Sequence, residues 1–521
     1  MDRQFAQAPA RGVGTEEQIG ASGNVEADST GSPLHVQVGT LRRLAVRGGV
    51  YIISSRLIVQ LFSWAITIVV ARLLRPYDYG ILTAAGTFTN LADILVEAGV
   101  CRALVQKREV SENDLAGAFT FTLLLSLAVF LTLFACAGIA ARALQTPELV
   151  NVLRVTGLAL LLVPFTAVPT AILERRLQLN RLTTIGLSYC IIQGCLVLTL
   201  VLCGWGYWGL IVGYMVPRVL NVLVLAWQTS WVPRLYWPAG WSNPLLSFGI
   251  HYTGSRLCWF CYRNVDYLIV GRLMGPIALG YYSLAFMLIS LPVDKIVATC
   301  NQFAFPIFCR MSDDLERVRA WYLRLSILFG FAAVPALVGL ALVANDAILV
   351  ALGQKWTPAV LPVQIMSLAG VFMVLGSSID VLYIARGRPD INFWFTAISV
   401  VVYPPLFYFC GRYFGITGVA MVWAVLYPIM VLLLIAATRS ITGISVRDVL
   451  GCQVRIWVSV LFMALVVLAT RSICQDVRVI SMRLGITVLA GVLGYVAAIR
   501  VFAWESVMGN VKPLWRELRS R

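Results

Sequence analysis

Residues 70–80 read Val-Ala-Arg-Leu-Leu-Arg-Pro-Tyr-Asp-Tyr-Gly, and residues 270–280 read Val-Gly-Arg-Leu-Met-Gly-Pro-Ile-Ala-Leu-Gly. The valine, the arginine, the first leucine, the proline and the last glycine are identical in the two stretches. Upstream, Ser-Arg-Leu occupies both 55–57 and 255–257, again 200 positions apart. A shared apolar composition alone would not produce this agreement, so the chain contains an internal repeat.

The composition is that of a membrane protein. Of 521 residues, 59% are hydrophobic and 13% are charged, and the mean hydropathy is +0.82. Soluble domains carry about 25% charged residues, so this chain cannot cover a water-facing surface for its 57.3 kDa. Lysines and arginines number 41 against 25 acidic residues, a net charge of +16. Because most of the protein must face lipid, the basic excess reflects membrane topology and not binding to nucleic acid.

Apolar stretches long enough to cross the membrane occupy most of the chain. A spanning helix needs about 20 apolar residues, and we expect fourteen such spans. They are predicted at 49–71, 79–98, 115–138, 149–172, 184–204, 207–230, 246–271, 277–300, 322–344, 360–384, 391–411, 416–437, 451–470 and 481–502. The loops between them are too short for a folded extramembrane domain. The fold class is therefore an all-α polytopic membrane protein.

The distribution of positive charge predicts the orientation. An even number of spans places both termini on one side of the membrane. If that side is the cytoplasm, about 27 of the 41 lysines and arginines fall on the inner side and about ten on the outer side. This is the positive-inside asymmetry, so we expect a multi-pass protein with both termini in the cytoplasm.

The repeat predicts the domain organisation. Six spans separate its two copies, so the copies point the same way and a pseudo-twofold axis runs along the membrane normal. We expect an N-lobe at 47–230 with spans 1–6, a C-lobe at 231–437 with spans 7–12, and spans 13–14 at 438–502. A disordered cytoplasmic tail is expected at 1–46 and a basic cytoplasmic tail at 503–521. Two lobes around such an axis enclose a central cavity, which suggests a transporter.

Charged and polar side chains inside the spans are the candidate functional residues. A charge at the bilayer centre costs at least about 2.5–3.5 kcal/mol, so it usually faces a cavity or a partner. These residues gather in the first two spans of each lobe. They are Arg56 and Gln60 in span 1, Asp93 and Glu97 in span 2, Arg256, Arg263 and Asp266 in span 7, and Asp294 and Lys295 in span 8.

The basic members of this set predict an anionic substrate. The planar fork of an arginine donates paired hydrogen bonds to oxyanions. We therefore expect Arg56, Arg256 and Arg263 to bind a phosphate or diphosphate, with Lys295 as a point charge and Gln60 on the same polar stripe as Arg56. Arg56 and Arg256 are repeat mates and are expected on facing walls of the cavity.

The acidic members suggest coupling to a cation or a proton. The candidates are Asp93, Glu97, Asp266, Asp294 and Asp380, the last of which stands alone among apolar residues of span 10. A structural alternative stays open for the whole set, because the charges can neutralise one another within the protein. In that alternative Arg56 pairs with Asp93 or Glu97, and Arg263 pairs with Asp266.

Other conspicuous residues have simpler interpretations. Arg72 and Arg272 directly follow their spans, so they are expected to be anchors at the membrane surface and turn formers. Cys258 and Cys261 have redox-motif spacing but lie in an apolar helix without a second ligand pair, which indicates ordinary thiols. With only two histidines in the chain, we expect no metal site and no cofactor.

Three stretches resemble a known family. Residues 71–80, the Gly-Gln-Lys-Trp-Thr-Pro at 353–358 and the Ala-Arg-Gly-Arg-Pro at 385–389 are similar to motifs of bacterial polysaccharide flippases. These form the polysaccharide transporter family of the multidrug/oligosaccharidyl-lipid/polysaccharide exporter superfamily. The resemblance implies that an undecaprenyl-diphosphate-linked oligosaccharide repeat unit crosses the inner membrane by alternating access of two lobes. Lipid II flippases of this superfamily use cavity arginines for the diphosphate, which is similar to what Arg56, Arg256 and Arg263 offer.

The resemblance further implies a role in making exopolysaccharide, capsule or O-antigen, alongside a polymerase or co-polymerase of the same pathway. Two other functions stay open. A polymerase or ligase of lipid-linked sugars would need a long outward loop bearing catalytic residues, and the outer loops here are short. A drug/cation antiporter of the same superfamily usually has twelve spans, so spans 13–14 favour a lipid-tailed substrate.

Overall fold

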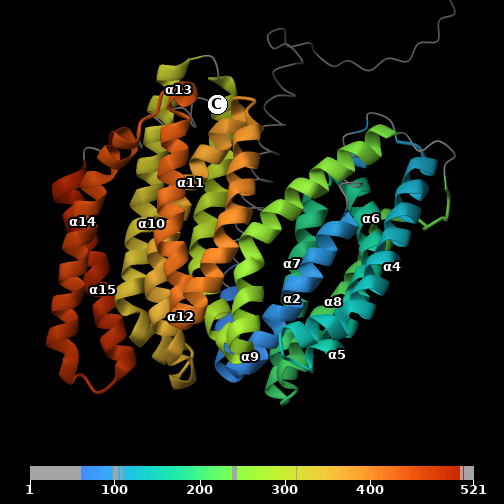
Figure 1. Cartoon of the computed structure of the whole chain (residues 1–521), viewed down its shortest axis with the longest axis horizontal. Helices are drawn as coiled ribbons and strands as arrows, with labels where there is room; N and C mark the ends of the chain where they lie inside the picture. The colour runs from blue at the N-terminus through green and yellow to red at the C-terminus, as the bar shows by residue number, and fades with distance from the viewer. Residues whose placement is uncertain are drawn as a thin grey trace, which may run out of the picture. The chain divides into compact units, whose positions relative to one another are not determined.

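The computed structural model describes residues 60, 62–97, 104, 105, 107, 110–237, 243–311, 314–504 and 508–509. These residues are helical with short connections, and no strand occurs among them, as the sequence predicts (Figure 1). The predicted tail at 1–46 and most of the predicted tail at 503–521 lie outside the described residues. The boundaries expected for the two lobes stay a prediction.

The first half of the chain forms six apolar helical segments. Their bounds are Phe62–Leu73, α2 Pro76–Glu97, α4 Glu112–Ala143, the continuous run α5 Leu149–Gly157, η1 Leu158–Leu162 and α6 Val163–Arg175, then α7 Leu179–Leu202 and α8 Gly206–Thr229. Each segment coincides with one of the first six predicted spans. The short 3₁₀ turn η1 sits just before Pro164, which is a residue that cannot donate a backbone hydrogen bond.

The second half of the chain contains longer helices. Their bounds are α9 Asn243–Arg310, α10 Leu315–Ala351, η2 Gln354–Ala359, α11 Val360–Ala385, α12 Pro389–Ala437, α13 Arg439–Thr442, α14 Val446–Ile473, η3 Cys474–Asp476, α15 Ile480–Ala498 and the π-turn η4 Ile499–Ala503. Helix α9 breaks at Gly275 (φ 79°) and α12 breaks at Gly415 (φ 63°). Because only glycine adopts such backbone angles readily, these two residues divide each helix into two arms.

Eleven of the described helices are long and apolar enough to cross a membrane, against fourteen predicted spans. Gly275 and Gly415 each lie between two predicted spans. The count of eleven treats the two arms on either side of each glycine as one helix. The first predicted span, 49–71, lies partly outside the described residues, and its described part is the short helix Phe62–Leu73. The structure thus confirms a polytopic all-helical protein, while the number fourteen stays a prediction.

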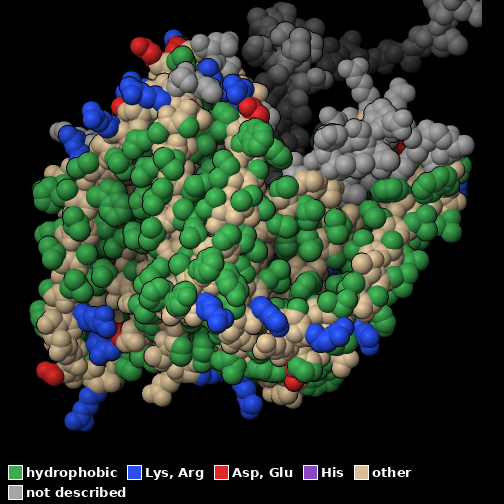
Figure 2. All heavy atoms as spheres, viewed as in Figure 1, with side chains coloured by type: hydrophobic (Ala, Val, Ile, Leu, Met, Phe, Trp, Pro, Cys, Tyr) green, Lys and Arg blue, Asp and Glu red, His purple; other side chains and the backbone are tan. Residues whose placement is uncertain are grey.

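The surface agrees with a membrane environment. Figure 2 shows apolar side chains across the middle of the viewed face, with lysine and arginine side chains toward its two ends. Exposed leucines, valines and phenylalanines occur on most helices, among them Leu131 on α4, Val425 on α12 and Leu465 on α14. A soluble protein would not expose so much apolar surface, so the described helices form a multi-pass membrane protein.

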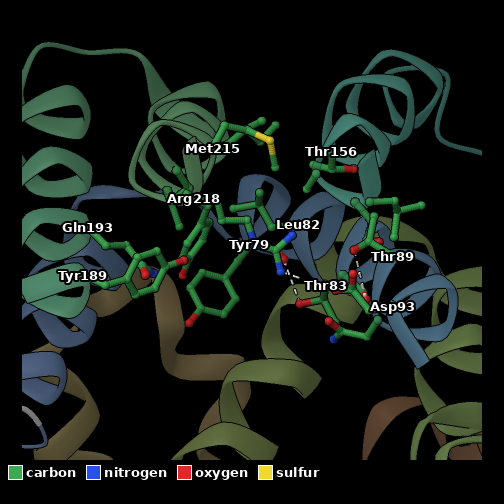
Figure 3. A pocket seen from close by; sticks show the side chains of 18 residues that line it. Tyr79, Leu82, Thr83, Thr89, Asp93, Thr156, Tyr189, Gln193, Met215 and Arg218 are labelled. Atoms are coloured by element: carbon green, nitrogen blue, oxygen red, sulfur yellow. Dashed lines mark hydrogen bonds and ion pairs between the residues drawn. The ribbon is translucent and has the colours of Figure 1, made fainter. Parts of the chain in front are cut away.

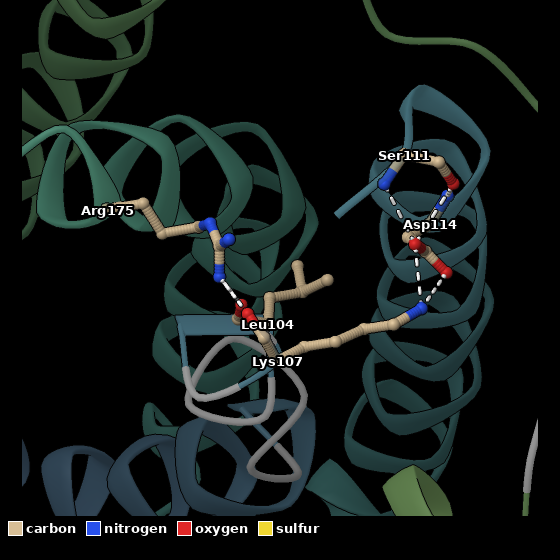
Figure 4. Close-up of polar contacts among 5 residues, drawn as sticks. All are labelled: Leu104, Lys107, Ser111, Asp114 and Arg175. Atoms are coloured by element: carbon tan, nitrogen blue, oxygen red, sulfur yellow. Dashed lines mark hydrogen bonds and ion pairs between the residues drawn. The ribbon is translucent and has the colours of Figure 1, made fainter. Parts of the chain in front are cut away.

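One end of α4 shows how local sequence sets a helix start. Ser111 caps the helix in a capping box with Asp114, and Lys107 holds both carboxylate oxygens of Asp114 at 2.8 Å. Arg175, at the end of α6, donates to the carbonyl of Leu104 at 2.7 Å (Figure 4). These charge-assisted bonds join Lys107 to the first turn of α4 and Leu104 to the end of α6.

The two halves of the chain meet along α2 and α9, which pack closely against each other. A Cβ atom added at Gly80 would lie 1.8 Å from the carbonyl oxygen of Pro276, and one added at Gly280 would lie 1.9 Å from that of Pro76. These four residues are two pairs of repeat mates, and each glycine touches the proline of the other copy. Such reciprocal contact is what a twofold relation between the copies requires. We call this contact the helix crossing.

A second contact between the halves joins two of the motifs that carry the family resemblance. The fully buried Trp356 of η2 donates its indole N–H to the carbonyl of Ala71 at 2.9 Å. The neighbouring Lys355 donates to the carbonyl of Arg72 at 2.6 Å. Both acceptors are at the end of the first apolar helix, where the last carbonyls have no partner within the helix. The stretch 353–358 therefore caps the end of the first apolar helix, Phe62–Leu73.

The two repeat-related arginines, Arg72 and Arg272, also form hydrogen bonds between the two halves of the chain. Arg72 donates to the carbonyl of Val350 near the end of α10 at 3.3 Å, and Arg272 donates to that of Ala143 at the end of α4 at 2.9 Å. Helices α4 and α10 are the third spans of their lobes, so each arginine caps the third span of the opposite lobe. A cation is favourable at a helix C-terminus. Arg72 and Arg272 are thus inter-lobe contacts as well as surface arginines.

Helices α14 and α15 pack on α10. The strongest polar contact joins the almost fully buried Asp346 of α10 to Arg483 of α15, with bonds of 2.7 and 2.9 Å. A bidentate pair of this kind has a fixed geometry. The last two predicted spans are therefore attached to the second half of the chain and do not contribute to the helix crossing.

The helix crossing can be tested by adding one methyl group. Gly80→Ala places a Cβ against the backbone of Pro276, which cannot rotate away, so we expect a loss of at least about 2 kcal/mol of stability. Gly138→Ala on α4 is the matched control, because nothing lies within 4 Å of its Cβ position and alanine favours helix by about 0.5–1 kcal/mol. Thermal unfolding of the purified protein in detergent measures both. Equal unfolding midpoints for the two variants would contradict the crossing.

Candidate functional site

One ion pair between predicted site residues joins the two lobes. Arg256 on α9 forms an ion pair with Glu97 at the end of α2. Their side chains keep 39% and 53% of their exposure, so the pair is accessible and not part of the packed core. The sequence assigned Arg256 to an anionic substrate and Glu97 to ion coupling. The structure shows that they pair with each other, as the structural alternative expects of such charges, and their two predicted roles stay predictions.

Arg263 lies one to two turns further along α9. Its guanidinium is 3.5 Å from a carboxylate oxygen of Asp294 on the second arm of α9. It also lies over the rings of Trp259 and Phe286, at 5.6 and 5.5 Å from their centroids. The break at Gly275 turns the second arm back beside the first, which explains why Arg263 meets Asp294. The pairing with Asp266 that the sequence suggested as an alternative does not occur.

Asp266 is fully buried and has another role. Its carboxylate accepts hydrogen bonds from the hydroxyl of Tyr282 at 2.6 Å, the indole N–H of Trp423 at 3.0 Å and the backbone N–H of Tyr267 at 2.9 Å. These donors come from both arms of α9 and from α12. Asp266 thus cross-links three segments inside the second half of the chain, and its predicted role in ion coupling stays a prediction.

The remaining predicted residues are placed less completely. Gln60 is helical and half-buried, and it precedes the helix Phe62–Leu73. Arg56 lies outside the described residues. Lys295 is on α9 and Asp380 is on α11, but their side chains are also outside the described part of the structure.

A cavity of about 480 Å³ lies among α2, α5, η1, α7 and α8. We call it the N-lobe cavity, and Figure 3 shows Tyr189 and Gln193 of α7 on one side and Thr156 of α5 on the other. Its polar lining residues are Tyr79, Thr83, Thr89, Asn90, Asp93, Thr156, Tyr189, Gln193, Tyr214 and Arg218. Of these, the sequence analysis singled out Asp93 as a candidate site residue.

Arg218 is the partner of Asp93. Its guanidinium lies 3.4 Å from Oδ2 of Asp93, and Oδ1 of Asp93 is buried and has no hydrogen-bond partner among the described residues. The sequence carried a signal for Arg218, because it is an arginine inside predicted span 6. It was missed because it has no mate in the second repeat copy and no acidic residue close to it in the sequence.

The described residues contain no group of three or more histidine, cysteine, aspartate or glutamate side chains that could hold a metal ion. Cys258 and Cys261 of α9 are free thiols. The polar chemistry of this part of the chain consists of arginine–carboxylate pairs, amides, hydroxyls and tyrosine rings. Such groups bind and orient a polar ligand.

These features define a polytopic membrane protein built from two repeat-related groups of helices with paired charges between them. The sequence profile of the family described as polysaccharide biosynthesis protein matches residues 69–361, which is more than half of the chain. The chain therefore belongs to the polysaccharide biosynthesis protein family. The family resemblance of its sequence motifs is thereby confirmed.

Named relatives agree with this assignment. The chain is 25% identical to the lipopolysaccharide biosynthesis protein WzxC of Escherichia coli (strain K12), over 68% of this chain and 72% of the relative. It is 25% identical to the teichuronic acid biosynthesis protein TuaB of Bacillus subtilis (strain 168), over 65% and 70% of the two chains. It is also 25% identical to the succinoglycan biosynthesis transport protein ExoT of Rhizobium meliloti (strain 1021), over 64% and 67%.

Solved structures show the same fold. The lipid II flippase MurJ in an inward closed conformation aligns with a TM-score of 0.73 over 88% of this chain and 100% of that chain, at 15% identity. An inward-facing multidrug resistance transporter of the MATE family aligns with a TM-score of 0.61 over 74% and 94%, at 14% identity. At such identities the likeness concerns the fold alone.

The buried carboxylate of Asp266 can be tested through stability. Asp266→Asn keeps one acceptor oxygen but turns an N–H₂ group toward donors, so we expect a loss of about 1–3 kcal/mol. Asp294→Asn is the matched control on the same helix, because the Asp294 side chain is 61% exposed. Thermal unfolding in detergent should show a lower midpoint for Asp266→Asn only. An unchanged midpoint for Asp266→Asn would contradict the cross-linking role.

Proposed function

We propose that this protein is a flippase, which moves an undecaprenyl-diphosphate-linked oligosaccharide repeat unit across the inner membrane by alternating access. The observation that carries the proposal is the ion pair between Arg256 of α9 and Glu97 of α2. It puts an accessible arginine between the two lobes of a chain that belongs to a polysaccharide biosynthesis family. A transporter of anionic lipid-linked sugars needs a cation at this place.

Two arginine–carboxylate pairs, one between the lobes and one within α9, suit a diphosphate. Arg256 and Arg263 each carry a carboxylate counter-charge, Glu97 and Asp294, whose side chains are 53% and 61% exposed. Exposed ion pairs contribute only about 0–1 kcal/mol of stability. An incoming diphosphate can therefore replace the carboxylates as the partner of the arginines with little loss of free energy. Its oxygens accept the paired hydrogen bonds that an arginine fork offers. Between transport cycles, the carboxylates keep the arginines neutralised.

The two ends of α2 differ in a way that supports alternating access. Gly80 and Glu97 are 17 residues apart, or about 25 Å along a helix. The Gly80 end is closed by backbone contact at the helix crossing, and the Glu97 end is joined by an exposed ion pair. With both termini in the cytoplasm, the crossing is at the outer side of the membrane. We infer that substrate enters from the inner side and that the crossing opens for its release.

The exported unit would serve exopolysaccharide, capsule or O-antigen synthesis, with a polymerase or co-polymerase as the next partner. The chain is proposed to transport and not to catalyse. The drug/cation antiporter alternative draws support from the fold likeness to a multidrug transporter. A strain lacking the gene separates the two functions. Lipid-linked sugars should accumulate if the chain is the flippase, whereas unchanged polysaccharide with raised drug sensitivity would favour the antiporter.

The arginines are tested by substitution. Arg256→Ala and Arg263→Ala should abolish transfer of lipid-linked repeat units, which then stay in the inner leaflet, because a diphosphate without its cations cannot leave the headgroup region. The measurement is the fraction of labelled oligosaccharide accessible outside vesicles. Arg412→Ala is the control, since Arg412 is an exposed arginine beside the break in α12. Normal transfer by both variants would refute the diphosphate site and leave the fold assignment intact.

Ion coupling through Asp380 is tested separately. Asp380→Asn removes the titratable group and should weaken gradient-driven transfer if a cation or proton binds there. Asp390→Asn, on the exposed start of α12, serves as the control. Transfer is measured with and without an imposed proton or sodium gradient, and an ion dependence equal to wild type would reject this role for Asp380.

A further inference from the structure

We propose that the N-lobe cavity is the binding site for the first sugar residues of the transported lipid. The inference rests on the proposed function and adds to it a subsite, which takes an uncharged, hydroxyl-rich ligand of one or two sugar rings. The cavity volume of about 480 Å³ falls within the range of about 300–1,000 Å³ that is usual for small-molecule sites. Four of its walls carry polar side chains, from α2, α5, α7 and α8.

The charge of the lining favours a neutral ligand. Arg218 and Asp93 are the charged lining residues, and they neutralise each other at 3.4 Å. A diphosphate exchanges less readily for this carboxylate, because the Asp93 side chain is 24% exposed against 53% for Glu97 and 61% for Asp294, and a metal cation would be repelled by Arg218. The charged part of the substrate therefore belongs with Arg256 and Arg263, outside this cavity, and the cavity is left for an uncharged part.

The hydrogen-bonding capacity favours a ligand rich in donors. The hydroxyls of Thr83, Thr89 and Thr156 donate to backbone carbonyls of their own helices at 2.8–2.9 Å, so they present acceptor lone pairs to the cavity. Oδ1 of Asp93 is a further acceptor without a partner among the described residues. Leaving a buried acceptor unpaired costs about 1–3 kcal/mol. Sugar hydroxyls supply the missing donors, and the amides of Asn90 and Gln193 meet them with both donors and acceptors.

The aromatic lining suits a sugar ring. Tyr79, Tyr189 and Tyr214 contribute phenol rings to the cavity. An aromatic face is electron-rich and packs against the C–H face of a pyranose. The hydroxyl of Tyr79 already donates to the sulfur of Met287 at 3.1 Å, so its ring is held in place. Flat rings beside amides and hydroxyls match both the apolar face and the polar edge of a sugar.

The cavity lies next to the arginine that we assign to the diphosphate. Asp93 and Glu97 are four residues apart on α2, so their side chains lie on the same face, about 6 Å apart along the helix axis. Glu97 holds Arg256, and Asp93 holds Arg218 in the cavity. A diphosphate at Arg256 would therefore direct its first sugars toward Asp93. Along α2, the proposed diphosphate site at Glu97 is followed by the cavity at Asp93, just as the diphosphate of the substrate is followed by its first sugar.

A binding cycle tests the subsite. The full-length protein in nanodiscs is titrated with two probes: the lipid-linked oligosaccharide purified from a strain lacking the gene, and undecaprenyl diphosphate without sugar. Asn90→Leu and Gln193→Met each replace one amide by an apolar side chain of similar length. Each variant should weaken binding of the oligosaccharide lipid by roughly fivefold to tenfold and leave binding of undecaprenyl diphosphate within about twofold of wild type.

Two control variants separate this inference from the proposed function. Thr199→Val changes an exposed residue of α7 outside the cavity and should alter neither affinity. Arg263→Ala should weaken both probes equally, because both contain the diphosphate. Unchanged affinity of Asn90→Leu and Gln193→Met for the oligosaccharide lipid would overturn the subsite while the proposed function stands. Equal weakening of both probes by these variants would also overturn it, and a wild-type protein that binds neither probe would refute the proposed function itself.

Discussion

The backbone contact between α2 and α9 is the constraint on which the rest of the structure depends. Gly80 and Gly280 each leave room for the carbonyl of the proline in the other repeat copy, and no other residue type fits there. Arg72, Arg272 and Trp356 secure the same end through bonds to helix termini of the opposite half. The contact is made of equivalent parts from both copies, and in the proposed transport cycle it is the contact that opens.

Charges in the lipid-spanning part are used in three ways. Asp266 is buried and cross-links helices, and Arg218 with Asp93 forms a neutral pair in a cavity wall. Arg256 with Glu97 lies exposed between the lobes. All are costly in a membrane, but each is matched to its surroundings. The structure thus separates, by burial and partner, residues that look alike in the sequence, and the proposed function uses the exposed pair between the lobes.

Much of the fold was predictable, because lipid imposes a simple rule. Backbone groups in the membrane must be paired within a helix, so apolar length alone located the segments, and the repeat at 70–80 and 270–280 predicted two related halves. The candidate site was predicted only in part. Arg256 and Glu97 were both singled out, but Arg218 was not, because it has no mate in the second repeat copy and no acidic residue close to it in the sequence. The turn at Gly275 lies between two predicted spans, but the alignment of the two arms of α9 that brings Arg263 to Asp294 does not follow from the sequence pattern.

By itself the sequence determined that this is a helical membrane protein with a parallel repeat, a family signature and a limited set of charges inside its spans. Those properties depend on composition and periodicity, which are local. Only the tertiary structure decided which charges meet, that Asp266 is in the core and that a polar cavity forms among α2, α5, α7 and α8. These depend on helices far apart in the chain packing side by side, and side-chain pairing across such contacts is set by distances that no linear pattern contains.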